Sequence, residues 1–168
     1  MLVKHLKKVP KTPTMNEEKF DFLQNKFIGL AEKIDPEQKP LWGKMNAQQM
    51  LEHVAQFFEV STNKRHFPLA TPEEYLPKYR EFLWSEKEFK ENTKASMLPE
   101  EPQPLMFEEY KDSLNFLRQE MEEFFSFYKN QPHGTVQHPA FGNLSFEDWI
   151  QLHHKHVIHH LKQFNVQP

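Results

Sequence analysis

The residues with the clearest chemical potential are histidines near the end of the chain, where five of the ten lie between residues 153 and 160. His156 and His160 are four residues apart. On a helix this spacing places both imidazoles on one face, one turn apart. Imidazole is the commonest protein ligand for metal ions, and it suits zinc, nickel and iron. The spacing therefore predicts a pair of ligands for one divalent metal ion.

A third ligand has to come from another helix, and His53 is the candidate. It lies between Met50 and Phe57 on the apolar side of a second predicted helix. A lone histidine on an apolar face is usually a core residue, but each neutral imidazole in a cluster brings a donor and an acceptor that need partners. The residues alone leave both interpretations open, a metal centre or a set of hydrogen-bonded core histidines.

Other residues near this cluster have candidate roles. Gln163, one turn after His160, is either a partner that orients a ligand or an ordinary core or capping amide. His153 is a candidate contact or spare ligand, whereas His133 and His138 lie in a predicted loop and are expected at the surface. Five aromatic residues could line a pocket or pack in the core: Trp42, Trp84, Trp149, Tyr110 and Phe57.

Apolar residues at alternating three- and four-residue steps predict four helices, at about 16–34, 46–63, 107–130 and 145–164. Asn46 with Gln49, and Ser145 with Asp148, have the spacing of capping boxes. The long connection 64–106 contains six prolines and one expected short helix, at 73–84. No strand signal exceeds a few residues. The pattern predicts an all-α fold, an up-down four-helix bundle with a long crossover between helices two and three.

Composition limits the class of protein. The 168 residues are expected to form one domain, 1–168, with 1–14 a loosely ordered N-terminal segment carrying a solvated lysine cluster. A net charge of −3 without a basic stripe argues against a nucleic-acid partner. The absence of cysteine excludes disulfides, zinc-thiolate sites and a cysteine nucleophile. No apolar run is long enough to span a membrane and no secretory signal is present, so a cytoplasmic location is expected.

Several stretches of the sequence resemble the DinB-like superfamily. The run His-Val-Ile-His-His-Leu-Lys-Gln at 156–163 resembles that superfamily's last-helix signature, in which a histidine is followed four residues later by another and then by glutamine. Leu-Glu-His-Val at 51–54 matches the setting of its second-helix histidine. Trp-Gly-Lys-Met at 42–45, with the stretch from His138 to Trp149, resembles one uncharacterised branch. The similarity covers about residues 35–165.

This resemblance implies a four-helix bundle, often dimeric, with a divalent metal held by three histidines and open coordination positions. Carried over by residue, the ligands are His53, His156 and His160. Characterised relatives, bacillithiol S-transferases and a mycothiol-dependent isomerase, use the metal to activate a low-molecular-weight thiol. We therefore expect a homodimeric enzyme that transfers such a thiol to a small electrophile or hydrolyses with metal-bound water. The alternative is a non-catalytic metal-binding or dimerisation module with a structural or vestigial site.

Overall fold

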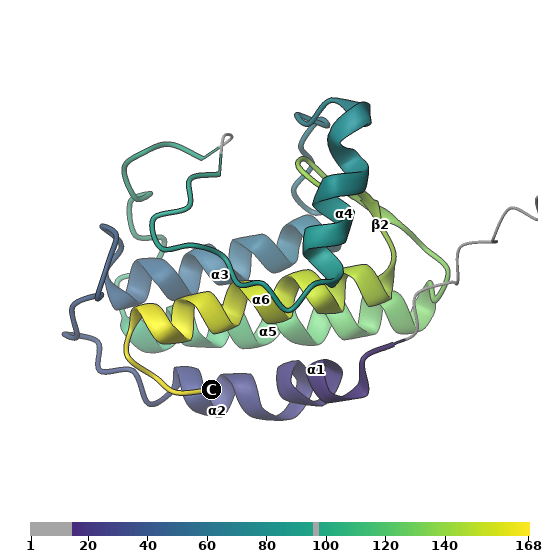
Figure 1. The fold of residues 1–168 in the computed structure, drawn as a ribbon. Helices are drawn as coiled ribbons and strands as arrows, with labels where there is room; N and C mark the ends of the chain where they lie inside the picture. Colours follow the sequence, from purple (N-terminus) through teal and green to yellow (C-terminus); the bar gives the residue numbers. More distant parts are fainter. Residues whose placement is uncertain (1–14, 96–97) are drawn as a thin grey trace, which may run out of the picture.

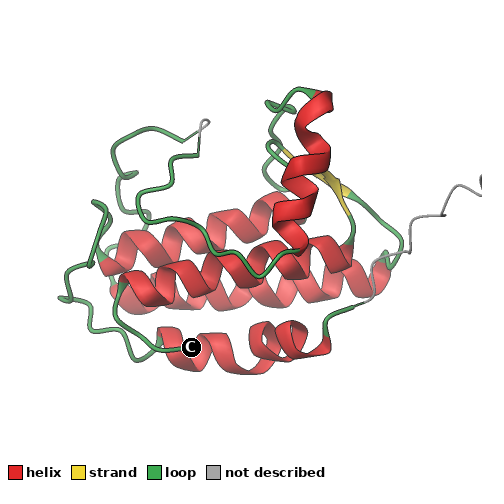
Figure 2. Ribbon diagram, in the orientation of Figure 1, coloured by secondary structure: helices red, strands yellow, loops and turns green. Residues whose placement is uncertain are grey.

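A computed structural model describes residues 15–95 and 98–168. The predicted loose segment 1–14 and its lysines lie outside the described residues. The described part is mostly helical with little strand, which is compatible with the expected all-α class (Figure 2). Its longest helical elements lie side by side as rods, and a shorter helix projects from them (Figure 1). None of the helices in the described ranges is long and apolar enough to cross a membrane.

The first rod contains a change of helical pitch that the sequence pattern did not predict. It is built from α1 (Glu17–Asp21), a π-helical turn (Phe22–Lys26) and α2 (Phe27–Ala31). Its start matches the prediction, because the Asn16 side chain accepts a hydrogen bond from the Lys19 backbone N–H. A π turn contains more residues than an α turn. The apolar face after the turn is therefore rotated about the helix axis relative to the face before it.

The two helices that carry the histidines, α3 (Ala47–Ser61) and α6 (Phe146–Gln163), begin where the capping boxes predicted. Asn46 Oδ1 accepts from Gln49 N at 2.8 Å, and Gln49 Oε1 accepts from Asn46 N at 3.0 Å. Ser145 and Asp148 make the equivalent pair of bonds at the start of α6. Both helix starts are therefore fixed by local hydrogen bonds.

The rods do not alternate strictly in direction, so the expected up-down order is wrong in this respect. Helix α5 (Tyr110–Asn130) runs parallel to α3, because Ser113 bonds Glu52 near their starts and Tyr128 bonds the Ser61 carbonyl near their ends. The crossover returns the chain to the end of the molecule where α3 began (Figure 1). Helix α6 then runs back, antiparallel to α3, which places the histidine-bearing stretches of both helices side by side.

The crossover is attached to both histidine-bearing helices. It contains a 3-10 turn (Glu73–Tyr75) followed by α4 (Leu76–Trp84), as predicted. After α4 the chain runs along α6, where the buried Lys155 Nζ donates to the carbonyls of Ser85 and Lys87. It returns along α3, where the Glu52 carboxylate accepts from the backbone N–H groups of residues 106 and 107. These bonds explain why α5 begins three residues later than predicted.

A small hairpin, β1 (Val136–His138) paired with β2 (Gly142–Leu144), precedes α6 and was not predicted. His138 Nδ1 closes its turn by accepting from the backbone N–H groups of Ala140, at 3.0 Å, and Phe141. The prediction that His138 lies on a surface loop is therefore wrong, because its ring is largely buried against Phe57 and Trp149. His133 is exposed, as expected.

Asp148 joins the projecting helix α4 to α6. Its buried carboxylate accepts two hydrogen bonds from Arg80 Nη2, both at 2.9 Å, and one from Trp84 Nε1 at 2.9 Å. The same group also caps α6 through Ser145. One side chain thus satisfies donors from two helices in a place that water does not reach.

Replacing this carboxylate is expected to destabilise the protein markedly. Asp148→Ala leaves the Trp84 and Ser145 N–H groups without their acceptor, so the free energy of unfolding should fall by about 3 kcal/mol. Urea denaturation measures the change. Glu147→Ala is the control, since Glu147 lies in the same turn without a hydrogen-bond partner among the described residues. Its loss should cost under ~1 kcal/mol, and equal losses in both variants would contradict the role of Asp148.

Candidate metal centre

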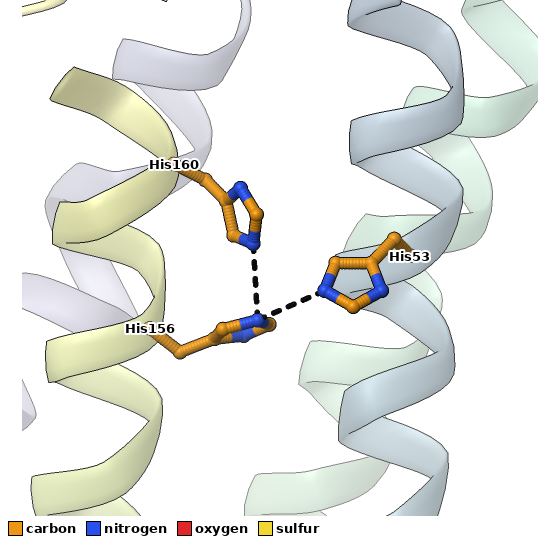
Figure 3. A group of neighbouring side chains, drawn as sticks. All are labelled: His53, His156 and His160. Atoms are coloured by element: carbon orange, nitrogen blue, oxygen red, sulfur yellow. Dashed lines mark hydrogen bonds between the residues drawn. The ribbon is translucent and has the colours of Figure 1, made fainter. Parts of the chain in front are cut away.

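Three imidazoles meet between α3 and α6. His53 projects from α3 towards His156 and His160, which project from successive turns of α6 (Figure 3). His156 Nε2 lies 3.0 Å from His53 Nε2 and 3.0 Å from His160 Nε2. One ligand nitrogen from each ring falls within 4.8 Å of the other two. The histidines from two distant stretches therefore converge as expected, into a cluster that could hold a metal ion.

All three imidazoles are held in the neutral form. Burial lowers the pKa of His53 to about 4. Burial and the neighbouring histidines lower the pKa values of His156 and His160 well below the usual 6.5. A metal ion binds the lone pair of a neutral imidazole, so the cluster is ready to bind one at neutral pH without first losing protons.

Gln163 fixes the position of the proton on His160. Its Nε2 donates to the Trp42 carbonyl at 2.9 Å, and its Oε1 lies 2.8 Å from His160 Nδ1. Because a carbonyl oxygen only accepts, the Nδ1 atom of His160 must carry the proton. A neutral His160 then has a bare Nε2 atom, which points into the cluster. Of the two roles open for Gln163, the structure supports the first, because its amide contacts and orients the His160 ring.

The hydrogen atoms available cannot satisfy both short contacts of His156. Its Nε2 atom either carries a single proton, which points in one direction, or is bare. If the atom is bare, the contact with the bare His160 Nε2 contains no proton; if it is protonated, it can donate to only one neighbour. At most one of the two 3.0 Å contacts is therefore a hydrogen bond.

A shared cation removes this conflict, because it attracts all three lone pairs at once. Tetrahedral zinc with Zn–N bonds of 2.0–2.1 Å separates its nitrogen ligands by roughly 3.3 Å. The two observed separations of 3.0 Å lie within a few tenths of an ångström of that value. Three protein ligands also leave coordination positions open, which is the pattern of catalytic rather than structural zinc sites. The donor set thus fits a divalent metal.

His153 is close in sequence but belongs to the core instead. Its ring stacks on Phe58 with centroids 3.8 Å apart, and its Nε2 lies 2.9 Å from Ser61 Oγ. Since the Ser61 hydroxyl donates to the Phe58 carbonyl, His153 is the donor in this bond. His153 is therefore not among the converging ligands, and nothing in the sequence pointed to Ser61 as its partner.

The five candidate pocket aromatics divide into two groups. The Phe57 ring adjoins the centre, because its centroid lies 4.4 Å from that of His156. The Trp42 ring instead contacts His159, with centroids 5.5 Å apart, and His159 is not one of the three converging histidines. The other three are used elsewhere: Trp84 bonds Asp148, Trp149 is fully buried in the core, and Tyr110 donates to the Ile34 carbonyl.

The comparison with family models matches residues 17–167 to the family described as Protein of unknown function (DUF1569). The chain belongs to this family. The match spans α1 to α6 and so includes every residue of the DUF1569 chain's histidine centre. No curated protein and no solved structure matches the chain.

Burial of His138 makes the stability of this DUF1569 protein depend on pH. Burial lowers the pKa of His138 to about 3, whereas the unfolded chain has a value near 6.5. Between these two values the unfolded state binds the extra proton. The contribution of the neutral ring is therefore complete above pH 6.5 and is lost as the pH falls towards 3.

The variant His138→Asn tests this linkage. An asparagine Oδ1 can still accept from the Ala140 N–H, but it does not titrate. In metal-free protein between pH 6 and 4, the free energy of unfolding should fall more steeply in the wild type than in the variant. The expected difference in slope is about 1.4 kcal/mol per pH unit, measured by urea denaturation. Parallel slopes would show that His138 titrates normally.

Proposed function

We propose that this protein is a divalent-metal-dependent enzyme of the DinB-like type, in which His53, His156 and His160 bind zinc, nickel or iron. The observation that carries the proposal is the pair of 3.0 Å Nε2 contacts, of which at most one is a hydrogen bond. The rods that lie side by side and the long crossover between α3 and α5 support the DinB-like assignment (Figure 1). A homodimer and a cytoplasmic location, both expected from the sequence, stay predictions.

The proposed reaction is transfer of a low-molecular-weight thiol to a small electrophile, or hydrolysis. A divalent cation with open positions lowers the pKa of a bound thiol or water, which supplies a nucleophile near neutral pH. The chain has no cysteine, so the thiol must arrive as a substrate. The three imidazoles would hold the metal ion. Gln163 fixes the orientation of the His160 ring, and Phe57 provides an apolar wall beside His156.

The second candidate is a non-catalytic metal-binding or dimerisation module with a structural or vestigial site. None of the three histidines lines the surface cleft of about 440 Å³ beside Glu108 and Tyr110, or the cleft of about 490 Å³ beside Arg80 and Phe141. His53 and His156 are nevertheless partly exposed, so the centre is not sealed from solvent. The two candidates therefore differ in what the metal-loaded protein does.

Metal binding is the first test. Protein purified without a histidine tag should bind one equivalent of Zn²⁺ per chain, measured by elemental analysis and chelator competition. Both His156→Ala and His160→Ala remove a ligand, so each should weaken binding by more than the ~10- to 100-fold typical of outer contacts. His133→Ala, which changes an exposed histidine, should bind normally. Wild-type protein that binds no divalent metal would contradict both candidate functions.

A thiol-consumption assay then separates the two candidates. Metal-loaded protein is incubated with a small thiol and an alkylating or epoxide electrophile, and the remaining thiol is measured. Consumption that His160→Ala abolishes and His133→Ala retains supports the enzyme. A stoichiometric metal whose removal lowers only the melting temperature, without thiol consumption or hydrolysis of activated esters, supports the structural module.

A further inference from the structure

We propose that Gly43 and Gln163 act together as a positioning unit that keeps His160 in the tautomer able to bind metal. This inference rests on the proposed metal centre, and it assigns a role to a loop residue far from His160 in sequence. Two contacts carry it, one between Gln163 and the Trp42 carbonyl and one between Gln163 and His160. The close approach of Gly43 to the same amide adds the third.

The loop before α3 is attached to the last turn of α6 at Gln163. The Leu41 backbone N–H donates to the Gln163 carbonyl at 2.8 Å, while the Gln163 side chain donates to the Trp42 carbonyl at 2.9 Å. Gln38 Nε2 donates to the neighbouring Phe164 carbonyl. The Gln163 amide is buried, and hydrogen bonds hold it at both ends. Its NH₂ group bonds the loop, and its oxygen bonds His160.

The direction of this amide decides whether His160 can be a ligand. In the observed direction its oxygen accepts from His160 Nδ1–H, which leaves Nε2 bare. Turned by 180°, the amide would place its oxygen against the Trp42 carbonyl and its NH₂ group against Nδ1 of His160. Nδ1 would then have to accept, and the proton would move to Nε2, where it would occupy the lone pair that a metal needs. The Trp42 carbonyl excludes this second arrangement.

Gly43 permits the contact between loop and amide. Its φ of +80° lies in the left-handed region that favours glycine. A Cβ atom at this position would lie 2.9 Å from Gln163 Nε2, too close to be accommodated without a shift. Any larger residue therefore forces the Gln163 amide or the loop to shift, which disturbs the contact between them. His156 has no equivalent support, because its Nδ1 is buried without a partner among the described residues.

The first experiment measures the tautomer directly, in the full-length metal-free protein, by ¹⁵N NMR of the histidine rings. His160 should carry its proton on Nδ1 in the wild type and should become a mixture of tautomers in Gln163→Ala. Wild-type His160 protonated on Nε2, or an unchanged tautomer in Gln163→Ala, would overturn the inference. This readout needs no metal, so it stands even if the proposed metal centre fails.

The second experiment is a double-mutant cycle on the affinity for Zn²⁺. Gln163→Ala and Gly43→Ala should each weaken binding by ~10- to 100-fold, the range for loss of an outer contact to a ligand. Gln163→Ala removes the atoms that a Cβ at position 43 would meet, so adding Gly43→Ala to it should cause little further loss. Losses that multiply in the double variant would show that Gly43 does not act through Gln163.

Matched controls separate positioning from general loss of stability. Gly142→Ala is the control for the glycine change, because its φ of +77° gives the same backbone strain while its Cβ would meet Leu76 and not Gln163. Gln119→Ala is the control for the amide, since Gln119 is exposed on α5. Both should keep wild-type affinity for Zn²⁺. Weakened binding in either control, of the same size as in Gln163→Ala, would overturn the assignment. Wild-type protein without affinity for Zn²⁺ would contradict the proposed function instead.

Discussion

The structure of the centre depends on one constraint, that three neutral imidazoles present their Nε2 atoms to one another at distances no proton arrangement can fully satisfy. Neutral nitrogens tolerate such closeness when a cation lies among them. The helix starts, the interhelical packing and the loop before α3 all serve to keep the rings there. Helix α3 and helix α6 each begin at a capping box, so each histidine stands at a fixed height and angle from a defined start.

Local interactions made much of the fold predictable. The starts of α3 and α6 depend on capping side chains within one turn, and the short helix in the crossover has Pro77 in its first turn. The positions of all three agree with the prediction. The late start of α5 depends on Glu52, which lies far away in sequence and binds the residues before it. The hairpin has strands too short to leave an alternating pattern, and an imidazole closes its turn. Long-range contacts of this kind leave no local signal.

The candidate site likewise has a part that the sequence predicts and a part that it does not. The spacing of His156 and His160 is a property of one helix, so it could be read directly, whereas placing His53 beside them required the apolar pattern of a second helix and a family resemblance. The Gln163 amide donates to the backbone carbonyl of Trp42. Every residue has a backbone carbonyl, so this contact leaves no signature in the sequence. Only Gly43, a glycine directly after a tryptophan, marks the place where two segments come unusually close.

The two attachments of the crossover have an evolutionary consequence. Lys155 of α6 binds the carbonyls of Ser85 and Lys87, and Glu52 of α3 binds the N–H groups of residues 106 and 107. Lys155 and Glu52 each lie one position before a histidine of the centre. Between these anchors the connection can lengthen at small entropic cost, because loop-closure entropy grows only with the logarithm of length. The intervening stretch can therefore vary in length and sequence, while the helices that carry the imidazoles keep their geometry.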